Sequence, residues 1–377
     1  MIFNRFLIVF IFLISISCAQ NPINRCPSAT GDGFTSGSNF SDQNSCKALI
    51  SEAPANIKLD FLVSNEELKR QRVELVHQIN NVPDLTHGLT IAAEVDEKYQ
   101  TIRLFDRKAG RILKGAKARC LLLHGSGSTR SNANAMRSIL RHFSEPNLGK
   151  KTGTIGELRS YPNYIPMACE AIEMPGHRMG PDLKGFKNSD GTFNINNTID
   201  WLASYIFEMK KETPGLPLFV LTRSSQSAPA SLVLVSEKYS GLLDGMIGMS
   251  ATWPGNEKLL RDGLSILEDI GEDEGFKINK PGLEWAEYNL LNTHWDSHFF
   301  KDQHVLFMTG GIDRQIVDAE RALYKGLSLT KKNIWYKEFP KANHDILNTS
   351  KEFREVGLEA YRFIFDFIYD VMKSREK

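Results

Sequence analysis

An α/β fold built on a doubly wound, mostly parallel sheet is the fold class that this sequence predicts. Short, largely apolar runs recur along the chain, among them Ala118–Leu123 and the unbroken Leu218–Leu221, and such runs are typical of strands buried on both faces. Segments with helical character, such as 199–209 and 228–235, separate these runs. The regular alternation of the two patterns predicts parallel strands joined by helices.

Residues 1–19 are predicted to be a signal peptide. Arg5 is the only charge near the start, and Phe6–Ile16 is apolar apart from one serine but is short for a membrane span. The small residues Ser17–Ala19 offer a cleavage site. We therefore expect a protein that is secreted or exported to the periplasm or cell envelope. Cys18 leaves open a lipoprotein, with the lipid attached to its thiol.

The composition of the 377-residue chain balances 46 basic against 45 acidic residues. Such a balance creates no global field that would attract nucleic acid, so we expect no nucleic-acid partner. In an exported protein, Cys26 and Cys46 are expected to form a local disulfide. Cys120 and Cys169 lie in apolar runs, and we expect both to be buried as small hydrophobic side chains.

An N-terminal arm with one helix is predicted for residues 20–85. Residues 20–56 show no periodic apolar pattern. Ser64 and Glu67 match a capping box, which predicts a helix that ends near Asn80. We expect the charges of this helix to face solvent.

The domain predicted for residues 86–377 begins with two alternating strands, at 89–95 and 101–105. The apolar run that follows them ends in His-Gly-Ser-Gly-Ser at 124–128. The glycines allow a tight turn, so that the N–H of Ser126 can point into a site above the sheet. This loop lacks the first glycine of a phosphate-binding loop and matches the dinucleotide pattern only in part, so we expect no cofactor.

Several histidines are not expected to take part in catalysis or metal binding. His177 follows a strand in a Pro-Gly turn, and loop histidines are more often surface residues than catalytic ones. His294, Asp296 and His298 could in principle hold a metal, but two histidines at a helical spacing without a clear third and fourth ligand are a weak signal, so we expect no metal site. They lie in residues 254–302, whose tryptophans and phenylalanines predict a helical cap over the strand ends.

The stretch 215–233 carries the strongest chemical signal. A buried strand turns into a helix with serines between them, as in a nucleophile elbow. The usual G-x-S-x-G glycines are missing. If Ser224 is the nucleophile, Thr222 and Gln226 take the places of the glycines, and the strand register favours this choice. Ser225 is the alternative nucleophile, with an arginine and a serine in those places.

An acid and a histidine follow two late apolar runs. Asp313 comes after the run 304–309, and His344 comes after the run 333–339. Serine, then acid, then histidine is the chain order of a hydrolytic triad on this architecture. The sequence therefore predicts a triad of Ser224, Asp313 and His344.

Five short motifs, ordered along the chain, carry a family resemblance: Leu-His-Gly at 123–125, Met-Pro-Gly-His at 174–177, Gly-Leu-Pro-Leu-Phe-Val-Leu-Thr-Arg-Ser at 215–224, Gly-Gly-Ile-Asp-Arg at 310–314 and Ala-Asn-His-Asp at 342–345. With them, the chain from about Leu89 onward resembles the α/β-hydrolases, and among these the monoacylglycerol lipase and lysophospholipase group. It departs from the family in the missing elbow glycines, in the N-terminal arm and at Glu173, where the family usually has aspartate.

The resemblance implies an exported serine hydrolase that cleaves carboxylic esters through an acyl-enzyme. His344 would take the proton of Ser224, Asp313 would hold the imidazole, and the N–H groups of Ser126 and Ser225 would form the oxyanion hole. The expected substrate is a small-molecule or lipid ester, such as an acylglycerol or lysophospholipid, with peripheral membrane contact. The alternative is a catalytically silent, hydrolase-like binding protein of the cell envelope, because larger residues replace the elbow glycines.

Overall fold

The computed structural model describes residues 57–81, 91–112, 114–125, 139–143, 153–177, 179–189, 194–224, 227–239, 241–251, 303–313, 321, 325–326, 328–329 and 331–375. The predicted signal peptide, the arm up to residue 56, the Cys26–Cys46 disulfide and the cap at 254–302 lie outside these residues. The domain boundaries therefore stay predictions.

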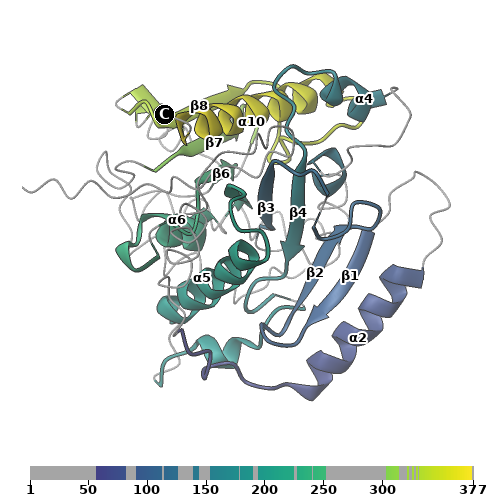
Figure 1. Cartoon of the computed structure of the whole chain (residues 1–377), viewed down its shortest axis with the longest axis vertical. Coiled ribbons are helices and arrows are strands. Elements are labelled where there is room, and N and C mark those ends of the chain that lie inside the picture. Colours follow the sequence, from purple (N-terminus) through teal and green to yellow (C-terminus); the bar gives the residue numbers. More distant parts are fainter. Residues whose placement is uncertain are drawn as a thin grey trace, which may run out of the picture.

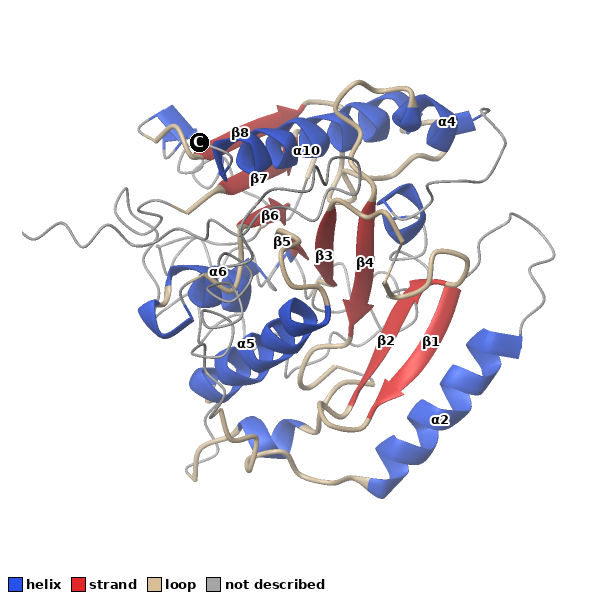
Figure 2. Cartoon of the chain, viewed as in Figure 1, coloured by secondary structure: helices blue, strands red, loops and turns tan. Residues whose placement is uncertain are grey.

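An eight-stranded sheet forms the centre of the described part of the chain (Figures 1 and 2). The strand order is β1-β2-β4-β3-β5-β6-β7-β8. The β1–β2 and β2–β4 pairs are antiparallel, and all the other pairs are parallel. The predicted α/β fold with a mostly parallel sheet is confirmed. The strands are β1 (Ile91–Asp96), β2 (Thr101–Asp106), β3 (Ala118–Leu123), β4 (Met167–Ile172), β5 (Leu218–Arg223), β6 (Gly245–Met249), β7 (Val305–Gly310) and β8 (Ile334–Phe339).

Helices cover both faces of the sheet, and alternate residues of each buried strand point to opposite faces. Leu121 and Val220 pack with α5 and α6 in one hydrophobic core. Leu122 and Leu221 pack with α10 in the other. The helices are α2 (Glu66–Asn81), α4 (Gly153–Arg159), α5 (Ile195–Glu212), α6 (Ser227–Val235) and α10 (Arg354–Arg375), with short 3-10 turns η1 (Leu183–Phe186) and η3 (Glu237–Tyr239). None of the helices in the described ranges is both long and apolar enough to cross a membrane.

The strand predictions agree closely with the structure because these strands are buried on both faces. The predicted run Ala118–Leu123 coincides with β3, and every residue of it is buried. Cys120 and Cys169 are register partners in β3 and β4, and both are buried as predicted. Strands of this kind are apolar along most of their length, which makes their boundaries visible in the sequence.

Helix α2 packs against the edge strand β1 (Figure 1), and two expectations about it were wrong. The predicted capping box does not form. Instead, Asn65 Oδ1 accepts a hydrogen bond of 3.1 Å from the N–H of Leu68, while Ser64 Oγ donates to Glu66. Its charges do not all face solvent either, since Arg72 is buried and donates to the carbonyl oxygens of Met179 and Gly180. A local sequence pattern does not show which of two adjacent polar residues caps a helix. It also does not show which distant backbone groups a side chain will bind.

Buried charges connect β3, β4 and α5. The carboxylate of Glu170 on β4 is fully buried, with Arg119 Nη2 of β3 at 3.2 Å and the donating hydroxyl of Tyr205 at 2.5 Å. Arg111 lies 3.5 Å from the same carboxylate and also pairs with Glu212 at 2.5 Å. Burial and the neighbouring carboxylate raise the pKa of Tyr205 well above its usual value, so its hydroxyl keeps its proton.

Candidate active site

Ser224 lies at the turn between β5 and α6, at the carboxyl edge of the sheet. Its φ is +54°, in the left-handed region that residues other than glycine rarely enter, and it is only 3% exposed. A strained serine between a strand and a helix is the backbone feature of a nucleophile elbow. Ser225, the alternative nucleophile, lies outside the described residues.

Two hydroxyl groups bond to each other across this turn. Thr222 Oγ1 and Ser227 Oγ are 2.7 Å apart, and neither residue is exposed to solvent. Thr222 also lies 3.4 Å from the carbonyl oxygen of Ile247, which can accept its proton. Hydrogen bonding therefore accommodates Thr222 at the first glycine place of the usual motif, while Gln226, at the second, lies outside the described residues.

The loop after β3 lies beside Ser224. A Cβ atom added to Gly125 would stand 3.2 Å from Cβ of Ser224 and 3.6 Å from the carbonyl oxygen of Arg223. The approach to Cβ of Ser224 is tighter than ordinary van der Waals contact, so a side chain at Gly125 would require Ser224 to shift by a few tenths of an ångström. Ser126, the predicted oxyanion donor, follows directly but lies outside the described residues.

Asp313 and His344 come together across the ends of β7 and β8. The distance between Nδ1 of His344 and Oδ2 of Asp313 is 2.8 Å, and the carboxylate is buried. The carboxylate accepts the Nδ1 proton in this arrangement, which leaves Nε2 of the imidazole as a base. The side chain of His344 keeps 19% exposure, so it can be reached by a substrate.

Gly310 sets the separation of these two loops, and this leads to a prediction. A Cβ at Gly310 would collide with the carbonyl oxygen of Asn343 and come within 2.7 Å of that of Ala342. We expect Gly310→Ala to lower the free energy of unfolding by about 1–3 kcal/mol, as for other overpacked sites. Gly326→Ala is the control, because a Cβ there meets nothing within 4 Å. Urea unfolding of both variants measures the effect. Equal free energies of unfolding for the two variants would contradict the close contact at Gly310.

A second link joins the elbow to the histidine loop. Nη2 of Arg223, next to Ser224, lies 4.0 Å from Oδ1 of Asp345, next to His344. Ser250, at the end of β6, donates from its hydroxyl to the carbonyl oxygen of His344 at 3.1 Å. The structure thus gathers the serine, the acid and the histidine at one edge of the sheet, on the loops after β5, β7 and β8.

This arrangement decides the fold. An antiparallel pair precedes a run of parallel strands, a strained serine follows a central strand, and an acid and a histidine follow two later strands in that chain order. The chain has an α/β-hydrolase fold.

Solved structures of several hydrolases resemble this chain over most of their length. A soluble variant of monoglyceride lipase from Saccharomyces cerevisiae has a TM-score of 0.48 and 13% identity, covering 76% of this chain and 97% of the lipase. Est1E from Butyrivibrio proteoclasticus has a TM-score of 0.45 and 14% identity, with coverage of 74% and 99%. An esterase from Pyrococcus furiosus has the same TM-score and identity, with coverage of 74% and 89%. Comparisons with protein-family models and with curated proteins find no match. The α/β-hydrolase assignment therefore rests on the sheet and its loops.

Two histidines outside the predicted triad pack against each other in the loops after β3 and β4. The rings of His124 and His177 are 4.5 Å apart, and both are buried, so the expected surface position of His177 was wrong. Nδ1 of His124 donates to the carbonyl oxygen of Gly125 at 2.8 Å, while Nε2 accepts the N–H of Met174 at 3.1 Å. The ring therefore holds the loop after β3 against the loop after β4.

Both imidazoles are neutral in this position. Burial lowers the pKa of His124 to about 4 and that of His177 to about 3, and the nearby cation of Arg223 lowers the pKa of His124 further. The carboxylate of Glu173 lies 3.4 Å from Nε2 of His124 but does not offset the burial. The sequence signal that could have found this pair is the two histidines in equivalent Gly-containing loops after neighbouring strands.

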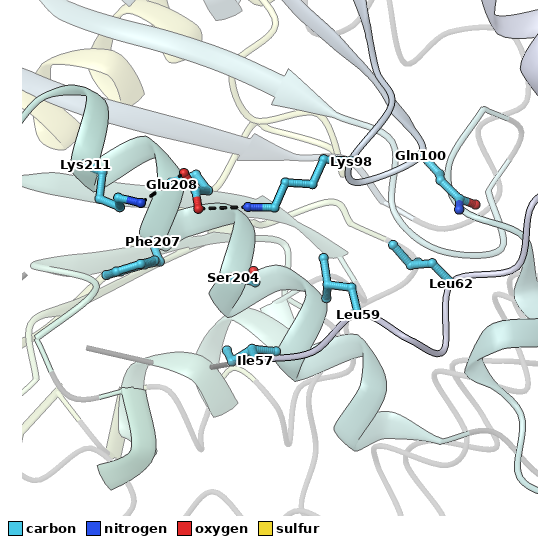
Figure 3. A pocket seen from close by; sticks show the side chains of 9 residues that line it. All are labelled: Ile57, Leu59, Leu62, Lys98, Gln100, Ser204, Phe207, Glu208 and Lys211. Carbon is cyan, nitrogen blue, oxygen red and sulfur yellow. Dashed lines mark hydrogen bonds and ion pairs between the residues drawn. The ribbon is translucent and has the colours of Figure 1, made fainter. Parts of the chain in front are cut away.

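A cavity of about 430 Å³ lies away from these residues, between α5, the β1–β2 turn and the segment 57–62 (Figure 3). Glu208 binds Lys98 at 2.8 Å and Lys211 at 3.6 Å across its wall. Ser224, Asp313 and His344 are not part of it, so it is not the place of the predicted chemistry. The cavity is lined by Ile57, Leu59, Leu62, Lys98, Gln100, Ser204, Phe207, Glu208 and Lys211.

Metal binding finds no support in the described ranges, where no group of three or more histidine, cysteine or acidic side chains is arranged to hold an ion. The weak candidates His294, Asp296 and His298 lie outside those ranges.

Proposed function

We propose that the protein is an exported serine hydrolase that cleaves carboxylic esters. The observation that carries the proposal is the His344–Asp313 hydrogen bond of 2.8 Å, at the sheet edge where Ser224 has a φ of +54°. Ser224 precedes Asp313 by 89 residues in the sequence, so the two features come from separate loops. Their combination is what nucleophilic catalysis by a serine requires.

In the proposed reaction, Nε2 of His344 accepts the proton of Ser224 as its Oγ attacks the ester carbonyl. Asp313 holds the imidazole in the required tautomer and stabilises the imidazolium. The imidazolium then protonates the leaving alcohol, and a water activated in the same way releases the acid from the acyl-enzyme. Backbone N–H groups of Ser126 and Ser225 are the proposed oxyanion donors.

The positive φ of Ser224 also supports this residue over Ser225 as the nucleophile. An elbow places the strained residue itself at the reacting centre, and β5 ends immediately before Ser224. The proposed substrates are acylglycerols or lysophospholipids, a choice supported by the sequence motifs at 174–177 and 215–224 and by the aromatic side chains at 254–302.

Covalent labelling tests the proposal. The folded protein is treated with a fluorophosphonate and digested, and the modified peptide is mapped. We expect one label, on Ser224, and none in protein unfolded in urea before treatment, because an ordinary serine hydroxyl does not react. Absence of labelling in the folded protein would refute the hydrolase and favour the silent binding protein. A panel of esters that differ in acyl length then defines the substrate.

A further inference from the structure

Arg223 occupies the position next to the proposed nucleophile. It is the last residue of β5, and its side chain keeps 22% exposure at the carboxyl edge of the sheet. Its Cγ lies 3.9 Å from the point where a Cβ of Gly125 would stand, so the side chain extends along the loop after β3. The cation therefore lies between that loop and the loop of His344, where a substrate would enter.

The described residues offer the guanidinium of Arg223 few hydrogen-bond acceptors. An arginine has five N–H donors, and the single ion pair that the described residues give Arg223 is the 4.0 Å approach to Asp345. This distance exceeds that of a hydrogen bond. The side chain of Asp345 is also 42% exposed, and exposed pairs of this kind contribute little.

Structural arginines in the same chain look different. Arg72 donates to two backbone carbonyl oxygens from a buried position, and Arg119 pairs with the buried Glu170 at 3.2 Å. Both guanidinium groups have a role within the fold. Among the described residues Arg223 makes no comparable bonds, and a partly exposed guanidinium beside a proposed nucleophile is suited to binding an anion.

We propose that Arg223 binds an oxyanion group of the substrate, a carboxylate or a phosphate, and so selects anionic esters over neutral ones. This inference rests on the proposed function, because it places the ester of the same molecule at Ser224. The anionic group can belong to the alcohol, as in an acylglycerol phosphate, or to the acid, as in a dicarboxylic half-ester. In either case its oxygens accept N–H bonds from a planar guanidinium and displace the weak contact with Asp345.

Two matched pairs of esters test the proposal and distinguish the two sources of the anion. The first pair is a monoacylglycerol and the acylglycerol phosphate with the same acyl chain. The second is p-nitrophenyl pentanoate and mono-p-nitrophenyl glutarate. The readout is the ratio of kcat/KM for the anionic ester to that for its neutral partner, in wild type, Arg223→Gln, Arg223→Lys, Asp345→Asn and the control Arg70→Gln, whose charge lies on the exposed face of α2.

We expect Arg223→Gln to lower this ratio about 10- to 100-fold for one of the two pairs, the loss that follows from removing a charge-assisted hydrogen bond. Arg223→Lys should give a ratio between those of wild type and Arg223→Gln. Asp345→Asn should raise the ratio because it removes the competing carboxylate. Arg70→Gln should leave it unchanged. If Arg223 only held the histidine loop, Arg223→Gln and Asp345→Asn would slow both esters of a pair equally, and that outcome would overturn the proposal.

Binding measurements on a variant without the nucleophile test the inference separately from the reaction. Titration calorimetry of Ser224→Ala with each ester, below its micelle concentration, is expected to give a Kd about 10-fold or more lower for the anionic member of the selected pair. Adding Arg223→Gln should abolish the difference. Tight anion binding without hydrolysis in wild type would sink the proposed function but not this inference. Equal affinities for both members of each pair would sink the inference whether or not the esters are cleaved.

Discussion

Ser224→Ala is expected to lower kcat for the preferred ester by about 10⁴- to 10⁶-fold, because the attacking oxygen is lost and only oxyanion stabilisation and binding remain. His344→Ala should cost a similar factor, since the serine hydroxyl is a weak nucleophile without its base. The two substitutions act on one unit. The double variant should therefore be no slower than either single variant. Steady-state kinetics on purified variants measure all three.

Ser225→Ala is the matched control for this prediction, because it removes a neighbouring hydroxyl but keeps the backbone N–H proposed for the oxyanion hole. It should retain activity within about 10-fold of wild type, a much smaller loss than removing a catalytic group causes. A large loss in Ser225→Ala together with a mild effect of Ser224→Ala would exchange their roles. Far-ultraviolet circular dichroism establishes that each variant is folded.

Arg119→Met is expected to give the largest loss of stability, about 3–5 kcal/mol in the free energy of unfolding. The substitution removes the closest cation from Glu170, whose carboxylate is fully buried, and breaking a buried pair on one side leaves an uncompensated charge. Arg111 lies 3.5 Å from the same carboxylate and compensates in part. Urea unfolding followed by tryptophan fluorescence measures the change.

Two comparisons make this stability prediction specific. Replacing both Arg119 and Glu170 by methionine should cost less than Arg119→Met alone, because no buried charge is left without a partner. Arg70→Met removes an exposed arginine whose pairs with Glu67 and Glu74 lie on the surface of α2, and it should change stability by less than about 1 kcal/mol. If the double variant is the least stable of the three, the burial of charge is not what destabilises the single variant.

The fold was predictable from the sequence because the apolar composition of its strands reflects their burial between helices. A strand such as β3 or β5, with helices packed on both faces, is largely apolar, and a loop must follow it. The positions of Ser224, Asp313 and His344 after β5, β7 and β8 then follow from the parallel arrangement, since parallel strands end at the same edge. Their proximity was therefore a topological expectation, and Asp313 and His344 are indeed hydrogen-bonded.

What escaped prediction depends on contacts between distant segments. Arg72 looks like an exposed helix residue until the loop at 179–180 supplies its acceptors, 107 and 108 residues further along the chain. Glu170 interrupts an apolar strand, and only the fold shows that Arg119 and Tyr205 meet it. The helix cap at Asn65 instead of Ser64 is a competition between adjacent polar side chains, which a motif alone does not decide.

The neutral pair His124 and His177 gives the candidate site an acid limit. Nε2 of His124 can accept the N–H of Met174 only while it is unprotonated, so a proton there breaks the bond between the loops after β3 and β4.

In the unfolded chain both histidines charge below about pH 6.5, whereas in the folded chain their pKa values are about 4 and about 3. The unfolded state therefore binds more protons between these values. The stability that the pair contributes is complete above about pH 6.5 and is lost as the pH falls toward 3. Thermal unfolding recorded across this range is expected to show the decline, flattened in His177→Phe. The contact that acid removes is the one that joins the loop carrying the proposed oxyanion donor to the loop after β4.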